Sequence, residues 1–369
     1  MASPSSDAAS LVSVRACTRA DRAEQVRLFN ACFKKSIDEG ALVWRYDENP
    51  SGAALSFVSR TEQGQAVSGY ACSPRVALSF GDEASRAVVG ETGDVMTHPE
   101  WRNRGLFSAL DRACMQAAKE RGWPLVFGLP NRRSAHIFLE LGWERVGTLR
   151  PWTFALANTA DARRERAKDG RVASWVWPWT VLRARGSRRA LARAGAPGLR
   201  ALELEEFPSE VAALSRAVET RFAFMVRRDA AYLDWRFAKS PSRLHRIIGV
   251  YDSSGALAAY CVVQVPREGE CVGYLVDVLA RDDAALAMAI GAGIDRLKQS
   301  GAALVRATAI DGSWWRAELA RAGFVPPKPE NHLTVIVQVH DRDHPLAKAA
   351  RDASKWYLTD GDRDDETMG

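Results

Sequence analysis

The sequence has few of the residues that mark metal-binding or disulfide-bonded proteins. It contains 6 cysteines and 6 histidines among 369 residues. The cysteines are scattered without a Cys-x-x-Cys pair, and no two histidines have a ligand-like spacing on an expected helix. We therefore expect no metal site and no disulfide framework, and we interpret the cysteines as reduced core residues.

Signals for membranes and export are missing as well. No stretch approaches the roughly 20 apolar residues that cross a bilayer. Met1–Asp7 is polar and lacks the basic start and apolar core of a secretory leader. These absences favour a cytoplasmic protein with no membrane span.

What is present is the composition of an ordinary globular protein, with 47% hydrophobic and 26% charged residues. A chain of 369 residues exceeds what one hydrophobic core usually serves, so we expect two domains. The formal net charge of +6 suits an anionic ligand, although nucleic acid and acidic lipid are also compatible with it.

One segment concentrates the chemistry of the chain. Gly90–Thr97 is typical of a strand, Pro99 breaks it, and an amphipathic helix is expected after Gly105. Arg102 and Arg104 precede that helix, whose first backbone N–H groups have no partner within the helix. These donors, the positive end of the helix dipole and two guanidinium groups favour a phosphate or pyrophosphate ligand.

The string from Val95 to Leu106 resembles the acyl-CoA-binding motif of the GCN5-related N-acetyltransferase (GNAT) superfamily. That motif has the form Arg/Gln-x-x-Gly-x-Gly/Ala between the fourth strand and the third helix. A short strand and a helix with Asn131-x-x-Ser134 at its start follow in the family's order and end at Gly142. One departure is Phe107, which stands at the third small position of the motif.

The resemblance implies acetyl-CoA or another acyl-CoA as cosubstrate. It also implies that the backbone of the strand before the loop meets the thioester carbonyl and the pantetheine. The cofactor-binding residues expected from the motif are Val95, Met96, Thr97, Arg102, Asn103, Arg104, Gly105, Leu106, Phe107, Asn131 and Ser134.

The chain repeats itself weakly. Trp44-Arg45 has a counterpart in Trp235-Arg236, and Asp94 has one in Asp277. Self-similarity at such a long period predicts two copies of one fold. We expect an α/β protein of two tandem GNAT-like domains, each a mixed twisted sheet flanked by helices.

The predicted organisation has four parts. An N-terminal CoA-binding domain (1–154) and a degenerate C-terminal domain (201–340) are separated by a basic Trp/Arg-rich linker (155–200). A C-terminal tail (341–369) follows. Because Arg281 and two acidic residues replace the Arg-x-x-Gly pattern in the second half, we expect only the first half to bind CoA.

In the linker sequence, arginines precede and follow the cluster Trp175, Trp177 and Trp179. This pattern occurs in RNA-binding segments and in interfacial membrane helices. It also fits a helical linker that docks its tryptophans and keeps its arginines in water. We favour the structural interpretation, so nucleic acid is an unlikely partner.

Acyl transfer to an amine requires a base. Glu91 and Asp94 are the candidates, and they lie on opposite faces of a regular strand unless the strand bulges. We favour Glu91, because Asp94 has a counterpart in the half that lacks the CoA loop. The family's usual acid is a tyrosine where this chain has Phe138. His136 or a tyrosine from elsewhere would substitute, or the thiolate leaves without an acid.

The tail resembles a closing segment of bacterial GNAT-like proteins associated with amino-sugar and polysaccharide pathways, and Asp362 is its candidate substrate contact. The sequence therefore predicts an acyl-CoA-dependent N-acyltransferase acting on the primary amine of a small molecule, such as an amino sugar or sugar nucleotide. The alternatives are a peptidoglycan-type aminoacyl transferase that uses aminoacyl-tRNA, and a non-catalytic acyl-CoA-sensing module.

Overall fold

The computed structural model describes residues 12–33, 36–80, 84–168, 177–195, 197–326 and 332–363. The first half begins at the N-terminal end of these residues and contains both strands and helices. Its elements are β1 (Val12–Ala16), α1 (Arg22–Cys32), α2 (Glu39–Asp47), β2 (Leu55–Thr61), β3 (Ala66–Ser79), β4 (Ser85–Thr97), α3 (Leu106–Glu120), β5 (Leu125–Gly128), α4 (Arg132–Glu140) and β6 (Glu144–Ala155).

The second half has a similar order of elements. They are β7 (Arg200–Leu204), α7 (Val211–Val218), β8 (Phe224–Val226), α8 (Ala230–Leu233), η6 (Asp234–Ala238), β9 (His245–Tyr251), β10 (Leu257–Gln264), β11 (Val272–Ala280), α9 (Asp283–Gln299), β12 (Leu304–Ile310), α10 (Trp314–Arg321) and β13 (Leu333–Val339). Between the halves lie α5 (Ala160–Lys168) and α6 (Trp177–Ala194). The chain closes with α11 (Pro345–Ala349), β14 (Trp356–Tyr357) and the short helix η8 (Asp360–Asp362).

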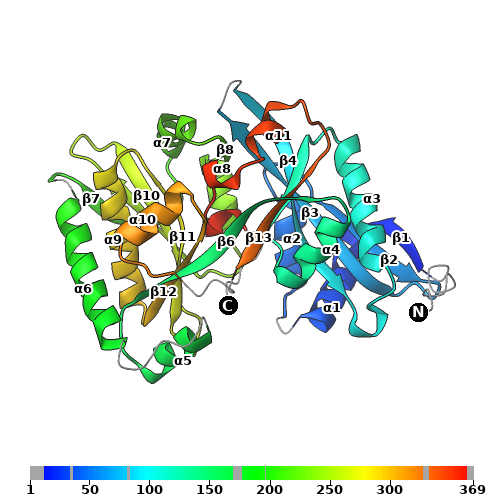
Figure 1. Cartoon of the computed structure of the whole chain (residues 1–369), viewed down its shortest axis with the longest axis horizontal. Helices are drawn as coiled ribbons and strands as arrows, with labels where there is room; N and C mark the ends of the chain where they lie inside the picture. Colours follow the sequence, from blue (N-terminus) through cyan, green and yellow to red (C-terminus); the bar gives the residue numbers. More distant parts are fainter. Residues whose placement is uncertain are drawn as a thin grey trace.

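Both halves share one continuous sheet, ordered β1-β2-β3-β4-β5-β13-β6-β12-β11-β10-β9-β7. The order is symmetric about its centre, because β1 corresponds to β7, β4 to β11 and β5 to β12. The central strands are exchanged: β13 of the second half pairs with β5, and β6 of the first half pairs with β12 (Figure 1). Each half therefore completes the sheet of the other.

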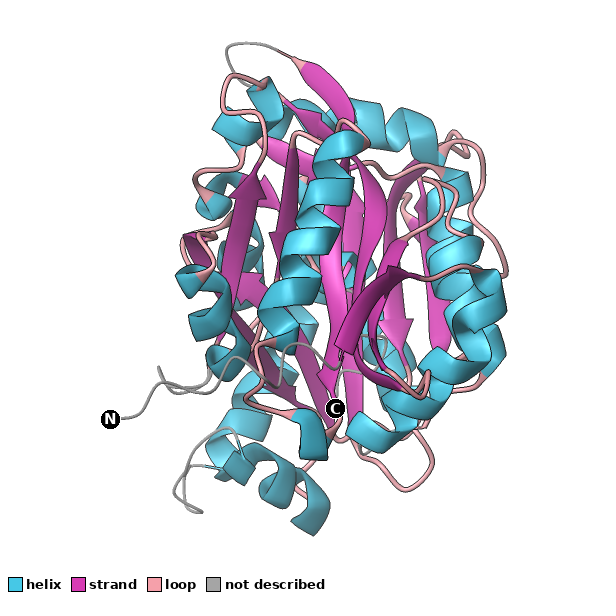
Figure 2. Cartoon of the chain, turned by 90° about the vertical axis from the view of Figure 1, so that its right-hand side faces the viewer, coloured by secondary structure: helices cyan, strands magenta, loops and turns pink. Residues whose placement is uncertain are grey.

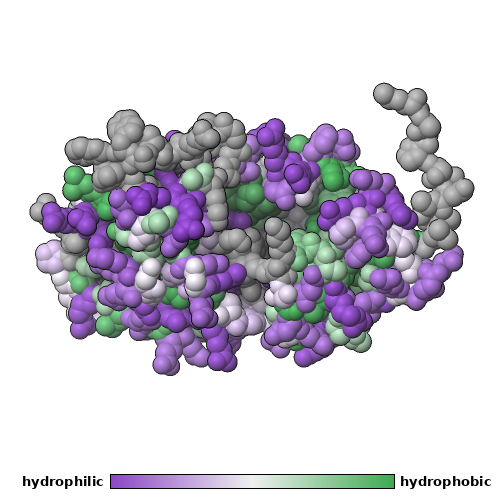
Figure 3. Space-filling view, turned by 90° about the horizontal axis from the view of Figure 1, so that it is seen from below, coloured by the Kyte–Doolittle hydropathy of each residue, from purple (hydrophilic) through white to green (hydrophobic). Residues whose placement is uncertain are grey.

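Helices cover both faces of the sheet (Figure 2). This explains why β10 and β11 are buried along their whole lengths, since strands covered on both faces read as continuous apolar runs. The face of the molecule in Figure 3 is mainly hydrophilic, with scattered apolar patches. Within the described ranges, no helix combines the length and the apolar character needed to cross a membrane.

Two tryptophans mark the approximate symmetry between the halves. The rings of Trp44 in α2 and Trp235 in η6 stack with their centres 5.0 Å apart. The Trp44 indole N–H donates to the Trp235 carbonyl at 2.9 Å, and the Trp235 indole N–H donates to the Trp44 carbonyl at 3.0 Å. Reciprocal contacts of this kind are expected where equivalent residues meet at a two-fold axis.

The segment between the halves is helical. Helix α6 packs against α9, and Arg188 forms an ion pair with Asp295 there. Trp175, one of the tryptophans on which the linker interpretation depended, lies outside the described residues.

Candidate active site

The first half has a fork between two parallel strands. β4 pairs with β5 only from Gly90 to Thr92, opposite Val126 to Gly128. β4 continues to Thr97 and stays paired with β3 on its other side. No described strand pairs with the β5-facing edge of β4 beyond Thr92, so the backbone groups there lack a strand partner. We call this the first fork.

β4 bulges at the fork. Asp94 has φ 47°, and the pairing of β4 with β3 shifts between Gly69 and Ala71. The bulge changes which way the two candidate carboxylates point. Asp94 meets α2, and Glu91 lies beside Arg75, whose guanidinium is 5.5 Å from the Trp235 ring centre. Because Trp235 stacks on Trp44 of α2, both carboxylates lie on the α2 side, and the opposite-face expectation does not apply because the strand is not regular here.

Glu91 lies in a buried ion pair one residue before the fork. Its Oε2 is 2.5 Å from Arg75 Nη2, and both side chains are 2% exposed. Burial raises the pKa of the Glu91 carboxyl, and the nearby charges of Arg75 and Arg236 oppose that rise. The carboxylate is therefore desolvated and close to the fork, and burial makes it a stronger proton acceptor than a solvated carboxylate.

Asp94 is held by two residues of α2. Its carboxylate accepts hydrogen bonds from Arg45 Nη1 at 2.5 Å and from the Tyr46 hydroxyl at 2.6 Å. These contacts fix the bulged backbone against α2. The arrangement agrees with a structural role for Asp94.

The loop after β4 leaves the start of α3 accessible. Gly105 is the N-cap residue with φ 72° and provides no side-chain acceptor for the first N–H groups of the helix. Asn103 also has a positive φ, of 62°. Arg102, Asn103 and Arg104 are exposed, and the Arg104 guanidinium lies 4.6 Å from the Trp101 ring centre. Unpaired N–H groups beside two exposed guanidiniums fit the diphosphate of CoA.

The other residues expected to bind the cofactor line the fork and the helix starts. Val95 and Thr97 are half-buried, whereas Met96 is buried and packs with residues of α1. Leu106 is buried at the start of α3. Ser134 lies in the first turn of α4, where its backbone N–H donates to the Asn131 side chain at 3.1 Å. The Asn131 carboxamide is thus a helix cap.

Phe138, which stands where the family has its acid, and His136, the candidate substitute, differ in burial. Phe138 is 2% exposed, and its ring centre is 5.0 Å from that of Phe107. It belongs to the aromatic core, and so does Phe107, which fills the motif's third small position. His136 has a side chain that is 76% exposed and pairs with Glu140 on the surface of α4. A solvated side chain there is poorly placed to protonate a buried thiolate.

The corresponding loop of the second half is closed by its own side chains. Asp282 caps α9 and accepts from the Ala285 N–H at 2.9 Å. Arg281 pairs with Asp252 at 2.9 Å and with Asp282 at 3.3 Å. Carboxylates already occupy the helix terminus and the cation, so this end of α9 has little capacity for a phosphate.

The C-terminal segment fills the second fork, which lies between β11 and β12. Those strands pair only from Val272 to Tyr274. Beyond them, the Asp360 carboxylate accepts from the Thr308 N–H at 2.6 Å, and the Thr359 hydroxyl donates to Asp277 at 2.6 Å. This segment is coloured red at the middle of Figure 1.

Asp362, the candidate substrate contact, belongs to that segment. It is 1% exposed, and its two oxygens accept from Arg228 at 2.7 and 2.8 Å. Arg228 also donates to Asp277. The structure therefore places Asp362 in a buried ion-pair network of the second half.

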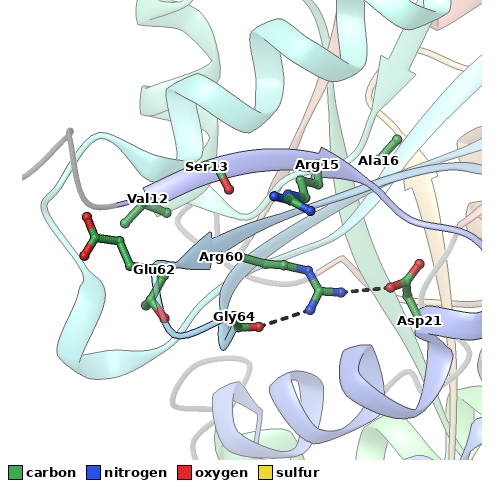
Figure 4. Close-up of a pocket in the computed structure, with 9 residues that line it drawn as sticks. Val12, Ser13, Arg15, Ala16, Asp21, Arg60, Glu62 and Gly64 are labelled. Carbon is green, nitrogen blue, oxygen red and sulfur yellow. Dashed lines mark hydrogen bonds and ion pairs between the residues drawn. The ribbon is translucent and has the colours of Figure 1, made fainter.

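A cavity of about 630 Å³ lies elsewhere, between β1 and the turn that joins β2 and β3 (Figure 4). Arg60 lies at its wall and donates to Asp21 at 2.8 Å and to the Gly64 carbonyl at 3.1 Å. None of the residues predicted for the active site lines this cavity.

Residues 13–146 match the model of the acetyltransferase (GNAT) domain family. The matched residues are those of the half that carries the predicted CoA motif, so the resemblance of this half to the GNAT superfamily is confirmed. None of the curated proteins compared with the chain matches it.

Solved structures extend the likeness to both halves. A conserved protein of unknown function from Enterococcus faecalis V583 has a TM-score of 0.62 at 14% identity, covering 91% of this chain and 74% of its own. A tandem GNAT protein from the clavulanic acid biosynthesis pathway has a TM-score of 0.55 at 15% identity, covering 89% and 98%. A GCN5-related N-acetyltransferase from Anabaena variabilis has a TM-score of 0.59 at 14% identity, covering 89% and 72%. At such identities the likeness establishes the fold, and the predicted tandem GNAT fold is confirmed.

Sequence reasoning missed the partners of Glu91. Arg75 is a charged residue inside the long apolar strand β3, and a buried charge needs a partner, so its position was a usable signal. Tyr232 and Trp235 come from the second half, and nothing in the local sequence predicts that they contact the first.

Proposed function

We propose that this protein is an acyl-CoA-dependent N-acyltransferase that acts on the primary amine of a small molecule, with its donor site in the first half. The observation that carries the proposal is the uncapped start of α3 at Gly105, flanked by exposed Arg102 and Arg104 and adjoining the first fork. The buried carboxylate of Glu91 beside that fork adds a base.

The residues divide the work of acyl transfer. Arg102, Arg104 and the first N–H groups of α3 bind the diphosphate. The open backbone edge of Val95–Thr97 holds the pantetheine and donates to the acyl carbonyl. When bound, acyl-CoA supplies an activated acyl group and a thiolate leaving group. Glu91 takes the proton that the acceptor ammonium must lose before it can attack.

Two measurements test the proposal. Calorimetry of the full chain with acetyl-CoA should show binding at one site per chain. Release of free thiol from acetyl-CoA should then be measured with glucosamine, a UDP-linked amino sugar, spermidine and lysine, and at least one amine should give turnover. Binding without turnover of any amine would favour an acyl-CoA sensor. Binding of tRNA without acetyl-CoA binding would favour the aminoacyl-tRNA alternative.

A further inference from the structure

A buried polar cluster lies where the two halves meet, on the α2 side of β4. Arg75 and Glu91 belong to the first half, whereas Tyr232 of α8 and Trp235 of η6 belong to the second. The Arg75 guanidinium lies 5.9 Å from the Tyr232 ring centre and 5.5 Å from the Trp235 ring centre. These four side chains are buried. The first half alone therefore does not complete the surroundings of Glu91.

Three polar atoms of this cluster have no hydrogen-bond partner among the described residues: the Tyr232 hydroxyl, Arg75 Nε and Glu91 Oε2, which nevertheless forms an ion pair with Arg75 Nη2. Buried polar groups in folded proteins are nearly always paired, with the protein or with a bound molecule. Burial raises the pKa of Tyr232 even though the charge of Arg75 lowers it, so the hydroxyl keeps its proton. The cluster thus offers two donors: one on Arg75, which is paired with Glu91, and one on Tyr232, whose ring lies near Arg75.

This set of groups selects a particular kind of ligand atom. An oxygen that accepts from the donors and gives a proton to the carboxylate fits all three groups. Water and the hydroxyl of an acceptor molecule meet this requirement. A carbonyl oxygen has no proton to give, and an ammonium nitrogen has no lone pair to accept with.

We propose that Tyr232 of the second half forms, with Arg75 and Glu91, a buried subsite that holds such an oxygen and connects the acceptor amine to Glu91. This inference rests on the acyl transfer proposed above. The Tyr232 hydroxyl donates to one lone pair of the oxygen. The other lone pair exchanges its contact with Arg75 Nε for the ammonium proton of the bound acceptor when that proton is transferred. The oxygen passes its own proton to Glu91, so one proton reaches the carboxylate and the oxygen is restored. Tyr232 is a positioning residue that keeps its proton throughout.

A crystal structure of the full chain with acetyl-CoA bound tests the subsite directly. We expect an ordered oxygen within hydrogen-bond distance of both the Tyr232 hydroxyl and Glu91. If it is water, it will be present before any amine is added; if it is an acceptor hydroxyl, it will appear only with the amine. Well-ordered side chains with no oxygen between them in either crystal would overturn the proposal.

Kinetics of Tyr232→Phe test the role of the hydroxyl, with acetyl-CoA and whichever amine of the four turns over. The substitution keeps the ring against Arg75 and removes one oxygen atom. We expect kcat to fall by about 10–100-fold, while the affinity for acetyl-CoA stays the same. The defect should shrink as pH rises, because an amine that is already deprotonated needs no route to Glu91.

Ser215→Ala is the matched control. The Ser215 hydroxyl in α7 is also buried without a partner among the described residues, and it lies outside the cluster. We expect Ser215→Ala to leave kcat and the pH profile unchanged. An unchanged kcat in Tyr232→Phe as well, or loss of acetyl-CoA binding in it, would overturn the proposal. Failure of the wild-type chain to bind acetyl-CoA would instead refute the proposed function.

Discussion

The two halves share an architecture and differ at the same helix start. In the first half, Gly105 caps α3 without a side-chain acceptor, and the arginines beside it are exposed. In the second half, Asp282 caps α9 with its own carboxylate and Arg281 is paired with acidic residues. The helix, the preceding strand and the fork are present in both. The capping residue and its neighbours therefore give the two helix starts a different capacity for phosphate while the fold is the same.

The two forks also differ in which groups pair with the polar atoms near them. In the second fork, Asp360 satisfies the N–H of Thr308, and Arg236 donates to the Gly361 carbonyl at 3.1 Å. In the first fork, Arg45, the counterpart of Arg236, pairs with Asp94. In each half, two neighbouring strands separate at the fork. The backbone polar groups that this separation leaves unpaired need hydrogen-bond partners in both halves. In the second half, the C-terminal segment provides these partners. We propose that the substrate provides them in the first half.

The largest effect is expected from Glu91→Gln, which removes the base proposed for the first half. Acyl transfer should slow by roughly 10²–10⁴-fold, with acetyl-CoA affinity unchanged in calorimetry. Because burial raises the pKa of Glu91 above the ordinary 4.5, wild-type kcat/KM should fall with decreasing pH at a point above 4.5. Below that point the carboxyl is protonated and cannot act as a base.

Asp94→Asn is the paired variant for that experiment. Loss of an ion pair with Arg45 should lower its stability and leave the chemical step largely intact. A stable but inactive Asp94→Asn beside an active Glu91→Gln would mean that Asp94 is the base.

Arg228→Met should cause the next largest effect, on stability. The cation is 1% exposed and pairs with Asp277 and Asp362, which are both buried. Removing it leaves two buried carboxylates without the cation that neutralises them, at a cost of about 3–5 kcal/mol. Urea denaturation should show this loss, while acetyl-CoA affinity of the folded variant stays unchanged. A change in affinity without a loss of stability would contradict the assignment of the tail to the second half's core.

The combination of Arg102→Ala with Gly105→Val tests the contrast between the helix starts. The first change removes a charge-assisted contact to phosphate, and the second strains a residue with φ 72°. Acetyl-CoA affinity should fall about 10–100-fold, which corresponds to roughly 1.5–3 kcal/mol. Arg281→Ala is the control and should leave the affinity unchanged. Comparable losses at both places would show that both halves bind CoA.

The smallest effect concerns the symmetry itself. Trp44→Phe and Trp235→Phe each remove one of the reciprocal hydrogen bonds, and each should cost about 0.5–1.5 kcal/mol of unfolding free energy. Near-equal values in chemical denaturation would support an equivalent contact. A large loss of unfolding free energy in only one variant would show that the two tryptophans contribute unequally to stability.

Much of the local structure could be read from the sequence. The strand ending at Thr97, the loop and the helix after Gly105 form as expected, and so do β5 and the helix capped by Asn131. These features depend on apolar periodicity, capping residues and glycine, which act over a few residues. The repeated Trp-Arg pair likewise indicated two copies of one fold.

The orientation of Glu91 and Asp94 could not be read in the same way. A strand is expected to alternate its side chains, and only the bulge at Asp94 breaks that alternation. The bulge is fixed by Arg45 and Tyr46, which precede it by dozens of residues. Contacts between residues so far apart cannot be predicted from the residues next to Asp94.

The sequence by itself thus determined the helix starts, the anion-binding pattern and its absence from the second half, because each depends on neighbouring residues. Only the tertiary structure decided that β6 and β13 change places, that η8 fills the second fork and that Tyr232 lies against Arg75, the partner of Glu91. These outcomes depend on which surfaces meet once both halves have formed. Burial of charges such as Arg75 then selects the arrangement in which each one has a partner.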